Sequence, residues 1–181
     1  MKILLHICCA PCAIHPFREL IKSGENEVTG FFYNPNIHPA SEEEKRRQAL
    51  TDYAKKENFE VIFGKYDVRE FFKRIGAEQE APSRCKICWR MRIEKAAEIA
   101  KTERFDAFTT TLLVSPYQDR ESITEIGAEC GRSFGVQFLA ADFRDGFRSA
   151  QEKAREHGIY RQKYCGCVFS EKERENKKCR K

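Results

Sequence analysis

The chain has 181 residues, of which 41% are hydrophobic and 34% are charged, values typical of a soluble globular protein. No apolar run reaches the roughly 18 residues that a membrane-spanning helix needs. The apolar N-terminal segment is short and leads into two cysteines rather than a signal-peptide cleavage site, so we expect a cytoplasmic protein without a membrane partner. The net charge of +5 is compatible with a nucleic-acid partner and equally with an ordinary solvated surface.

Strand and helix patterns alternate along the chain without an internal repeat or a linker, which predicts a single α/β domain over residues 1–181. Short apolar runs predict five strands, at residues 3–7, 28–33, 59–63, 105–113 and 136–140. Helices are expected after the first cysteines up to about residue 23, at 41–57, 68–75, 120–133 and 146–156, and in a long segment that carries Cys85 and Cys88 near its start. Ser41 and Glu44 have the spacing of a capping box. The alternation predicts a parallel sheet flanked by helices, followed by a basic tail that can be helical.

Nine cysteines are unusual for a chain of this size. Because the sequence has no export signal, clustered cysteines indicate metal ligands or redox groups rather than a disulfide framework. They form three clusters, which are Cys8-Cys9-Ala10-Pro11-Cys12, Cys85-Lys86-Ile87-Cys88 and Cys165-Gly166-Cys167. Each cluster follows a strand or lies in a long loop, and sites of parallel sheets form beyond the carboxyl ends of the strands. We therefore expect one shared site.

Cys85 and Cys88 form a C-x-x-C pair at a helix start, where free backbone N–H groups favour the thiolate. Cys8 and Cys9 point apart on an extended backbone, but in a turn both sulfurs can reach one metal centre. The four thiolates suit a 4Fe–4S cluster. A structural zinc site remains an alternative, although zinc ligand pairs are usually two cysteines separated by two to four residues rather than adjacent cysteines. Cys12 is left over beside this set, as a ligand for a second metal ion or as a free thiol.

The Cys165-Gly166-Cys167 segment has a different chemistry. A disulfide between Cys165 and Cys167 closes a very small, strained and easily reduced ring, and Gly166 permits the turn that it requires. The segment therefore indicates a redox-active dithiol, with ligands for another metal or two structural cysteines as alternatives. Cys130 lies between apolar residues of a predicted helix and is expected in the core.

Four segments resemble the QueH-type epoxyqueuosine reductases, in the order of that family: residues 5–12 (LHICCAPC), the Cys85/Cys88 pair, residues 110–118 (TTLLVSPYQ) and residues 160–167 (YRQKYCGC). The resemblance implies a Rossmann-like fold of the HUP or PP-loop kind. It implies reduction of epoxyqueuosine to queuosine at the wobble position of tRNAs for Asp, Asn, His and Tyr. It also implies a 4Fe–4S cluster on Cys8, Cys9, Cys85 and Cys88, a redox-active Cys165–Cys167 pair and independence from cobalamin.

Removal of an epoxide oxygen to leave an alkene takes two electrons and two protons. We hypothesise that the Cys165/Cys167 dithiol supplies an electron pair, recharged by an unidentified donor, and that an iron site acts as a Lewis acid. That iron is a corner of the cluster or one additional iron ion near Cys12. The candidate proton donors are Tyr160, Tyr164 and Asp142, with a cap or salt-bridge role as the alternative for Asp142.

A monomer that binds tRNA needs cationic side chains near this site. The candidates for phosphate contacts are Arg144, Arg148, Arg155, Arg161 and Lys163, with Lys172, Arg174, Lys177, Lys178, Arg180 and Lys181 in the tail. Tyr160, Tyr164 and Phe143 are candidates for stacking on an unstacked base.

Two other classes of protein explain part of the sequence. An ATP-using PP-loop enzyme needs a loop rich in glycine and serine after the first strand, where this chain has its first cysteine cluster. A non-catalytic zinc module that binds nucleic acid explains Cys8, Cys9, Cys85 and Cys88 but leaves Cys12 and the Cys165-Gly166-Cys167 segment without a role.

Overall fold

The computed structural model of the protein describes residues 1–179, and its centre is a parallel sheet in the order β3-β2-β1-β4-β5. The strands are β1 (Lys2–His6), β2 (Glu27–Phe32), β3 (Val61–Phe63), β4 (Ala107–Thr110) and β5 (Gln137–Phe138). All four pairings are parallel. The expected α/β fold with a five-stranded parallel sheet is therefore confirmed.

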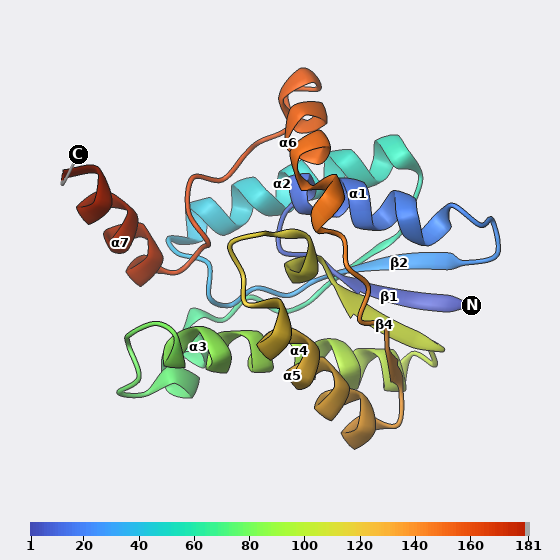
Figure 1. The fold of residues 1–181 in the computed structure, drawn as a ribbon, viewed down its shortest axis with the longest axis horizontal. Coiled ribbons are helices and arrows are strands. Elements are labelled where there is room, and N and C mark those ends of the chain that lie inside the picture. The colour runs from blue at the N-terminus through green and yellow to red at the C-terminus, as the bar shows by residue number, and fades with distance from the viewer. Residues whose placement is uncertain (180–181) are drawn as a thin grey trace.

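Helices cover both faces of the sheet. They are α1 (Ala10–Ile21), α2 (Ala40–Glu57), α3 (Val68–Ile75), α4 (Ser83–Thr102), α5 (Arg120–Phe134), α6 (Phe147–Glu156) and α7 (Val168–Cys179). Figure 1 shows α1, α2 and α6 on one side of the sheet and α3, α4 and α5 on the other, with α7 standing at the C-terminal end of the chain. Among the described residues, no helix is long and apolar enough to cross a membrane.

The central strands supply the core. Ile3, Leu4 and Leu5 of β1 have at most 1% of their surface exposed, because β2 and β4 pair with β1 on either side and helices cover both faces. A near-continuous apolar run is the pattern expected of a strand buried on both faces. Cys130 on α5 is also buried in this core, as predicted.

Two local expectations are wrong. The strand expected at 105–113 stops at Thr110, because the Thr110 side chain accepts a hydrogen bond from the Leu112 backbone N–H at 3.2 Å. The chain then turns into a short 3-10 helix, η1 (Thr111–Val114). The capping box is absent because α2 begins at Ala40, before Ser41, and the Pro39 carbonyl accepts the first backbone N–H groups. Both cases show local backbone partners overriding a sequence pattern.

Candidate metal and redox site

The first cysteine cluster lies where β1 meets α1, at the carboxyl edge of the sheet. Cys9 is the N-cap residue of α1, and Cys12 lies in the first turn of that helix. The ligand atoms of Cys8, Cys9 and Cys12 all lie within 4.8 Å of one another. Among the described residues this is the only such group of three or more side chains suited to a metal. The first turn of α1 therefore brings Cys12 next to Cys8 and Cys9, the two ligands predicted from this segment.

Hydrogen bonds favour negative charge on one member of this first group, Cys8. The Thr111 hydroxyl donates to the Cys8 sulfur at 3.4 Å, and the Gln162 side-chain amide donates to the Cys9 sulfur at 2.9 Å. Bonds from the Cys12 and Cys9 thiols hold the pKa of Cys8 well below its usual range. Hydrogen bonding to Cys8 raises the pKa of Cys12, and burial raises that of Cys9. One thiolate held by two thiols is a donor set that suits a cationic metal centre.

A second cysteine group faces the first from α4 and α7. Cys85 and Cys88 lie in the first turns of α4, and Cys167 directly precedes α7. The backbone N–H of Ser170 donates to the Cys167 sulfur at 3.4 Å, which places this sulfur at the start of α7. Burial raises the pKa of Cys88 to about 12. The second group therefore holds two buried cysteines, Cys88 on α4 and Cys167 at the start of α7, and the half-buried Cys85.

Two cavities connect the groups to solvent. The smaller, of about 270 Å³, is lined by Cys8 and Cys12, and the larger, of about 640 Å³, by Cys85, Cys88 and Cys167. Cys165 lines both cavities. Their other shared residues are Arg92, Tyr117, Gln118, Lys163 and Tyr164. The predicted four-thiolate set is therefore split between two adjoining cavities, and Cys165 stands at their boundary.

Cys165 and Cys167 are free thiols, the first exposed and the second buried. The disulfide expected between them is not formed in the structure. Gly166 has a φ of +145°, and a Cβ atom there would lie 3.0 Å from Ile37 Cγ1 and 3.1 Å from Asn36 Nδ2. Only glycine fits this conformation and this space. Gly166 is therefore required for the path of the chain between the two cysteines, while its role in a Cys165–Cys167 disulfide stays a prediction.

Three buried arginines were missed by the sequence analysis, namely Arg46, Arg84 and Arg92. Arg46 on α2 donates to the carbonyl oxygens of Cys165 at 3.0 Å and Tyr164 at 3.1 Å, and its Nε pairs with Glu42 at 2.8 Å. The Tyr160 hydroxyl donates to the other carboxylate oxygen of Glu42 at 2.5 Å. Arg46 therefore holds the segment of residues 164–167, called the redox loop below, against α2. Its only signal in the sequence is an i, i+4 pairing with Glu42, which exposed helices share.

Arg92 on α4 is 1% exposed and lines both cavities. Its Nε donates to the Cys88 carbonyl oxygen at 3.1 Å, while one Nη has no hydrogen-bond partner among the described residues. Burial lowers the pKa of Arg92, but the charges of Cys88, Cys165 and Cys8 outweigh that effect and raise it. A buried cation with a free N–H group is thus placed between the two cysteine groups.

The candidate proton donors differ in position. Asp142 is exposed and lines neither cavity, and hydrogen bonds from Arg144 lower its pKa to about 2. This arrangement agrees with the salt-bridge alternative. Tyr164 lines both cavities, its hydroxyl donates to the His38 carbonyl, and burial raises its pKa to about 12. Tyr160 is bound to Glu42 as described above. Tyr164 is therefore the candidate phenol closest to the cysteines.

The cationic side chains proposed for phosphate contacts differ in their distance from the cavities. Lys163 is exposed and lines both cavities, Arg174 lines the larger one, and Arg144 is paired with Asp142. Arg148, Arg155, Arg161 and Lys172 are exposed away from the cavity walls. Arg180 and Lys181 lie outside the described residues. Phe143, a candidate for stacking on a base, is 3% exposed and packed in the core.

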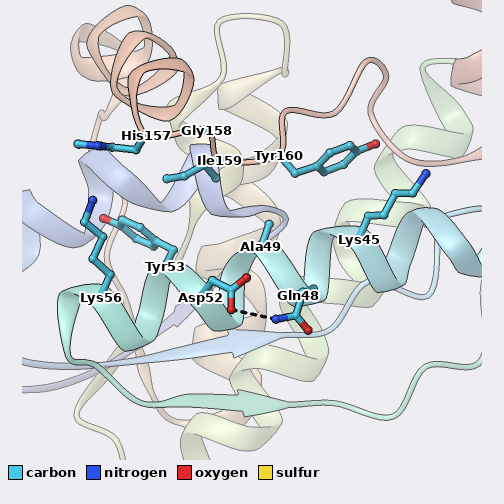
Figure 2. A pocket seen from close by; sticks show the side chains of 10 residues that line it. All are labelled: Lys45, Gln48, Ala49, Asp52, Tyr53, Lys56, His157, Gly158, Ile159 and Tyr160. Atoms are coloured by element: carbon cyan, nitrogen blue, oxygen red, sulfur yellow. Dashed lines mark hydrogen bonds between the residues drawn. The ribbon is translucent and has the colours of Figure 1, made fainter.

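A third cavity, of about 440 Å³, lies between α2 and the segment after α6. Figure 2 shows Gln48 and Asp52 of α2, hydrogen-bonded at 2.9 Å, across from His157 and Ile159. No cysteine lines this cavity. It is therefore separate from the redox chemistry of the two cysteine-lined cavities.

Fold and site together define a Rossmann-like α/β protein with a cysteine-rich centre at the carboxyl edge of its sheet. The family model described as "Epoxyqueuosine reductase QueH" matches residues 3–173. The chain belongs to this family. The resemblance found in its four sequence segments is thereby confirmed, and it favours a reductase over a zinc module or an ATP-using enzyme.

Named relatives agree over nearly the full length. The chain is 37% identical to the epoxyqueuosine reductase QueH of Thermotoga maritima, covering 97% of this chain and 93% of the relative. It is 34% identical to that of Dehalococcoides mccartyi, with coverage of 96% and 94%. Among solved structures, the U34-tRNA thiolase NcsA from Methanococcus maripaludis, described with its [4Fe-4S] cluster, matches with a TM-score of 0.61 at 13% identity. That match covers 94% of this chain and 61% of NcsA, and it shows the fold alone.

Proposed function

We propose that this chain reduces epoxyqueuosine to queuosine at the wobble position of tRNA, without cobalamin. One observation carries the proposal. In a chain of this reductase family, seven cysteines from three distant segments gather at one edge of the sheet. Two adjoining cavities are lined by Cys8, Cys12, Cys85, Cys88, Cys165 and Cys167, and the sulfur of Cys9 lies within 4.8 Å of those of Cys8 and Cys12. Such a convergence of thiols with a buried cation suits electron transfer to a substrate that enters from solvent.

The donor set fits a 4Fe–4S cluster. Sulfur ligands would be supplied by Cys8 and Cys9 on one side and by Cys85 and Cys88 on the other, and Arg92 lines both cavities. Hydrogen bonds to sulfur from Thr111, Gln162 and Arg84 are of the kind that tune such clusters. A cluster held there would supply electrons one at a time. Cys12 remains available for one additional iron ion.

Cys165 and Cys167 are proposed as the two-electron reductant. Their two thiols become a disulfide and release two electrons and two protons. Both C–O bonds of the epoxide break, a C=C bond forms, and the oxygen leaves as water. An external reductant, which is not identified, then returns the disulfide to the dithiol. The exposure of Cys165 at the wall of both cavities supports its contact with the substrate.

The phenol of Tyr164 donates to the His38 carbonyl in this structure, and it is proposed to turn from that bond and hold a proton near the leaving oxygen. A pKa of about 12 keeps it protonated at neutral pH, and its place on both cavity walls puts it beside Cys165. Asp142 is not needed in this scheme. The proposed partners are tRNAs for Asp, Asn, His and Tyr in the cytoplasm, bound by a monomer.

Anaerobic purification and assay test this function. A brown protein with about four irons and four sulfides should convert epoxyqueuosine to queuosine in tRNA, as measured by nucleoside analysis. Double replacement of Cys165 and Cys167 by serine should abolish conversion and leave the cluster absorbance intact. A colourless protein with one zinc and no conversion would overturn the proposal and favour the zinc module.

A further inference from the structure

Within the part of the chain that the structure describes, Tyr117 is the most exposed of the large hydrophobic side chains, with 84% of its surface open to solvent. It lies in the turn that follows η1, and its backbone N–H donates to the Ser115 hydroxyl at 3.3 Å. Its ring meets the Phe147 ring edge to face, with centroids 5.9 Å apart. The ring is therefore supported by a neighbour while most of its surface remains open to solvent.

Tyr117 lies beside the cysteines of the candidate site. It lines both of the cavities that contain the cysteines, so it stands at the mouth of the proposed reaction site. The next residue, Gln118, donates to the Cys165 sulfur at 3.8 Å and accepts a hydrogen bond from the Trp89 indole at 2.9 Å. Gln118 thus fixes the Tyr117 turn relative to the redox loop.

We infer that the open ring of Tyr117 stacks on the wobble base of the substrate RNA and holds it at the mouth of the two cysteine-lined cavities. This inference rests on the proposed function. The reacting epoxide lies on a side group of the base, so the base remains at the entrance while the epoxide reaches Cys165. Exposed aromatic rings are the usual platform for unstacked RNA bases.

The surroundings favour RNA over a protein partner as the occupant. Lys163 is exposed on the wall of the same two cavities, where its ammonium group can meet a backbone phosphate. Tyr117 is a single exposed aromatic residue on the walls of the two cavities, whereas a protein interface needs a broad apolar patch. The aromatic candidates named from the sequence are less open, because Phe143 is buried and the Tyr160 and Tyr164 hydroxyls are bonded within the chain.

Binding of an anticodon stem-loop RNA to the anaerobic holoenzyme tests the inference. Y117L removes the aromatic face and keeps apolar bulk, so its Kd should rise about 10-fold to 100-fold. Y117F and Y117W keep the face and should stay within about threefold of wild type. F72L is the matched control, because Phe72 is 44% exposed on α3 and lines neither cavity. Unchanged cluster absorbance and thermal unfolding verify that each variant is intact.

A second RNA identifies the base. If Tyr117 stacks on the wobble base, a stem-loop with an abasic wobble nucleotide should bind wild type and Y117L with the same Kd. Equal loss on the intact and abasic RNAs would overturn the inference, as would a Y117F variant as weak as Y117L. These measurements need only binding, so they are independent of the conversion assay. Failure of wild type to form queuosine would count against the proposed function instead.

Discussion

The Arg92 guanidinium donates from Nε to the carbonyl oxygen of Cys88, one turn earlier on α4, at 3.1 Å. This bond fixes a fully buried cation while one of its Nη groups has no partner among the described residues. An unpaired buried N–H group is costly unless it faces an anion. The geometry therefore gives Arg92 a positioning and charge-balancing role toward the cysteine-lined cavities on whose walls it lies.

Replacement of Arg92 by methionine should make the midpoint potential of the reconstituted cluster more negative. Loss of a nearby positive charge disfavours the addition of an electron, because reduction potentials of such clusters follow the local charge. R92K keeps the charge and should lie between R92M and wild type. Spectroelectrochemistry on the anaerobic protein measures the potential directly.

Arg90 provides the matched control for this experiment. It lies on the same helix, with its side chain 48% exposed and paired with Glu129 on α5. R90M should leave the potential unchanged. If R92M and R90M give the same potential, Arg92 has only a structural role.

Replacement of Arg46 by methionine should destabilise the fold by about 3 kcal/mol or more, because it leaves the Glu42 carboxylate buried without its partner. The redox loop also loses its two hydrogen bonds from Arg46, so we expect turnover to fall with stability. Denaturant unfolding under anaerobic conditions gives the free energy, and nucleoside analysis gives the turnover.

The neighbouring pair provides a control on the same helix. Arg47 pairs with Glu43 at the same i, i+4 spacing, but its side chain is 31% exposed. R47M also leaves a carboxylate buried without its partner, because the Glu43 side chain is only 7% exposed, so it should likewise cost about 3 kcal/mol. It leaves the hydrogen bonds of the redox loop intact and should keep turnover. Equal losses of turnover in R46M and R47M would show that the bonds to the redox loop contribute nothing.

The sequence predicts most of the fold because the strands here are short apolar runs buried on both faces. The helix expected at 68–75 has the bounds of α3, and all strand pairings are parallel, as the alternation of strands and helices predicts. The end of β4 could not be predicted, since it depends on a single bond from the Leu112 backbone N–H to the Thr110 side chain. Bonds of this kind leave no periodic signal.

The site was only partly predictable for a similar reason. Cysteine spacing is local information, so the three clusters and the turn at Gly166 could be identified. The grouping of Cys12 with Cys8 and Cys9 depends on how α1 begins, and spacing does not encode it. Buried arginines are the hardest case, because Arg92 carries no sequence mark that separates it from a surface arginine such as Arg90.

Replacement of Gly166 by alanine should destabilise the protein by about 2 kcal/mol or more, because φ is +145° and the new Cβ would crowd Ile37 and Asn36. The two redox cysteines flank this position, so we expect altered thiol oxidation as well. G158A is the control, since Gly158 has a φ of +64° and no atom within 4 Å of an added Cβ. That variant should cost only about 1 kcal/mol. Unfolding free energies of the two variants test the difference, which vanishes if the redox loop is free to rearrange.

Replacement of Asp142 by asparagine should leave turnover within about twofold of wild type, whereas Y164F should lower it at least about tenfold. With a pKa of about 2, the Asp142 carboxyl group is ionised at neutral pH and has no proton to give. Its pKa is depressed by folding, so its contribution to stability is present above about pH 4 and is lost as the pH falls toward 2. Because the group is exposed to solvent, that contribution should stay below about 1 kcal/mol. A D142N variant as inactive as Y164F would instead return Asp142 to the reaction as a proton donor. Single-turnover assays at neutral pH, with unfolding measured from pH 2 to 7, distinguish these outcomes.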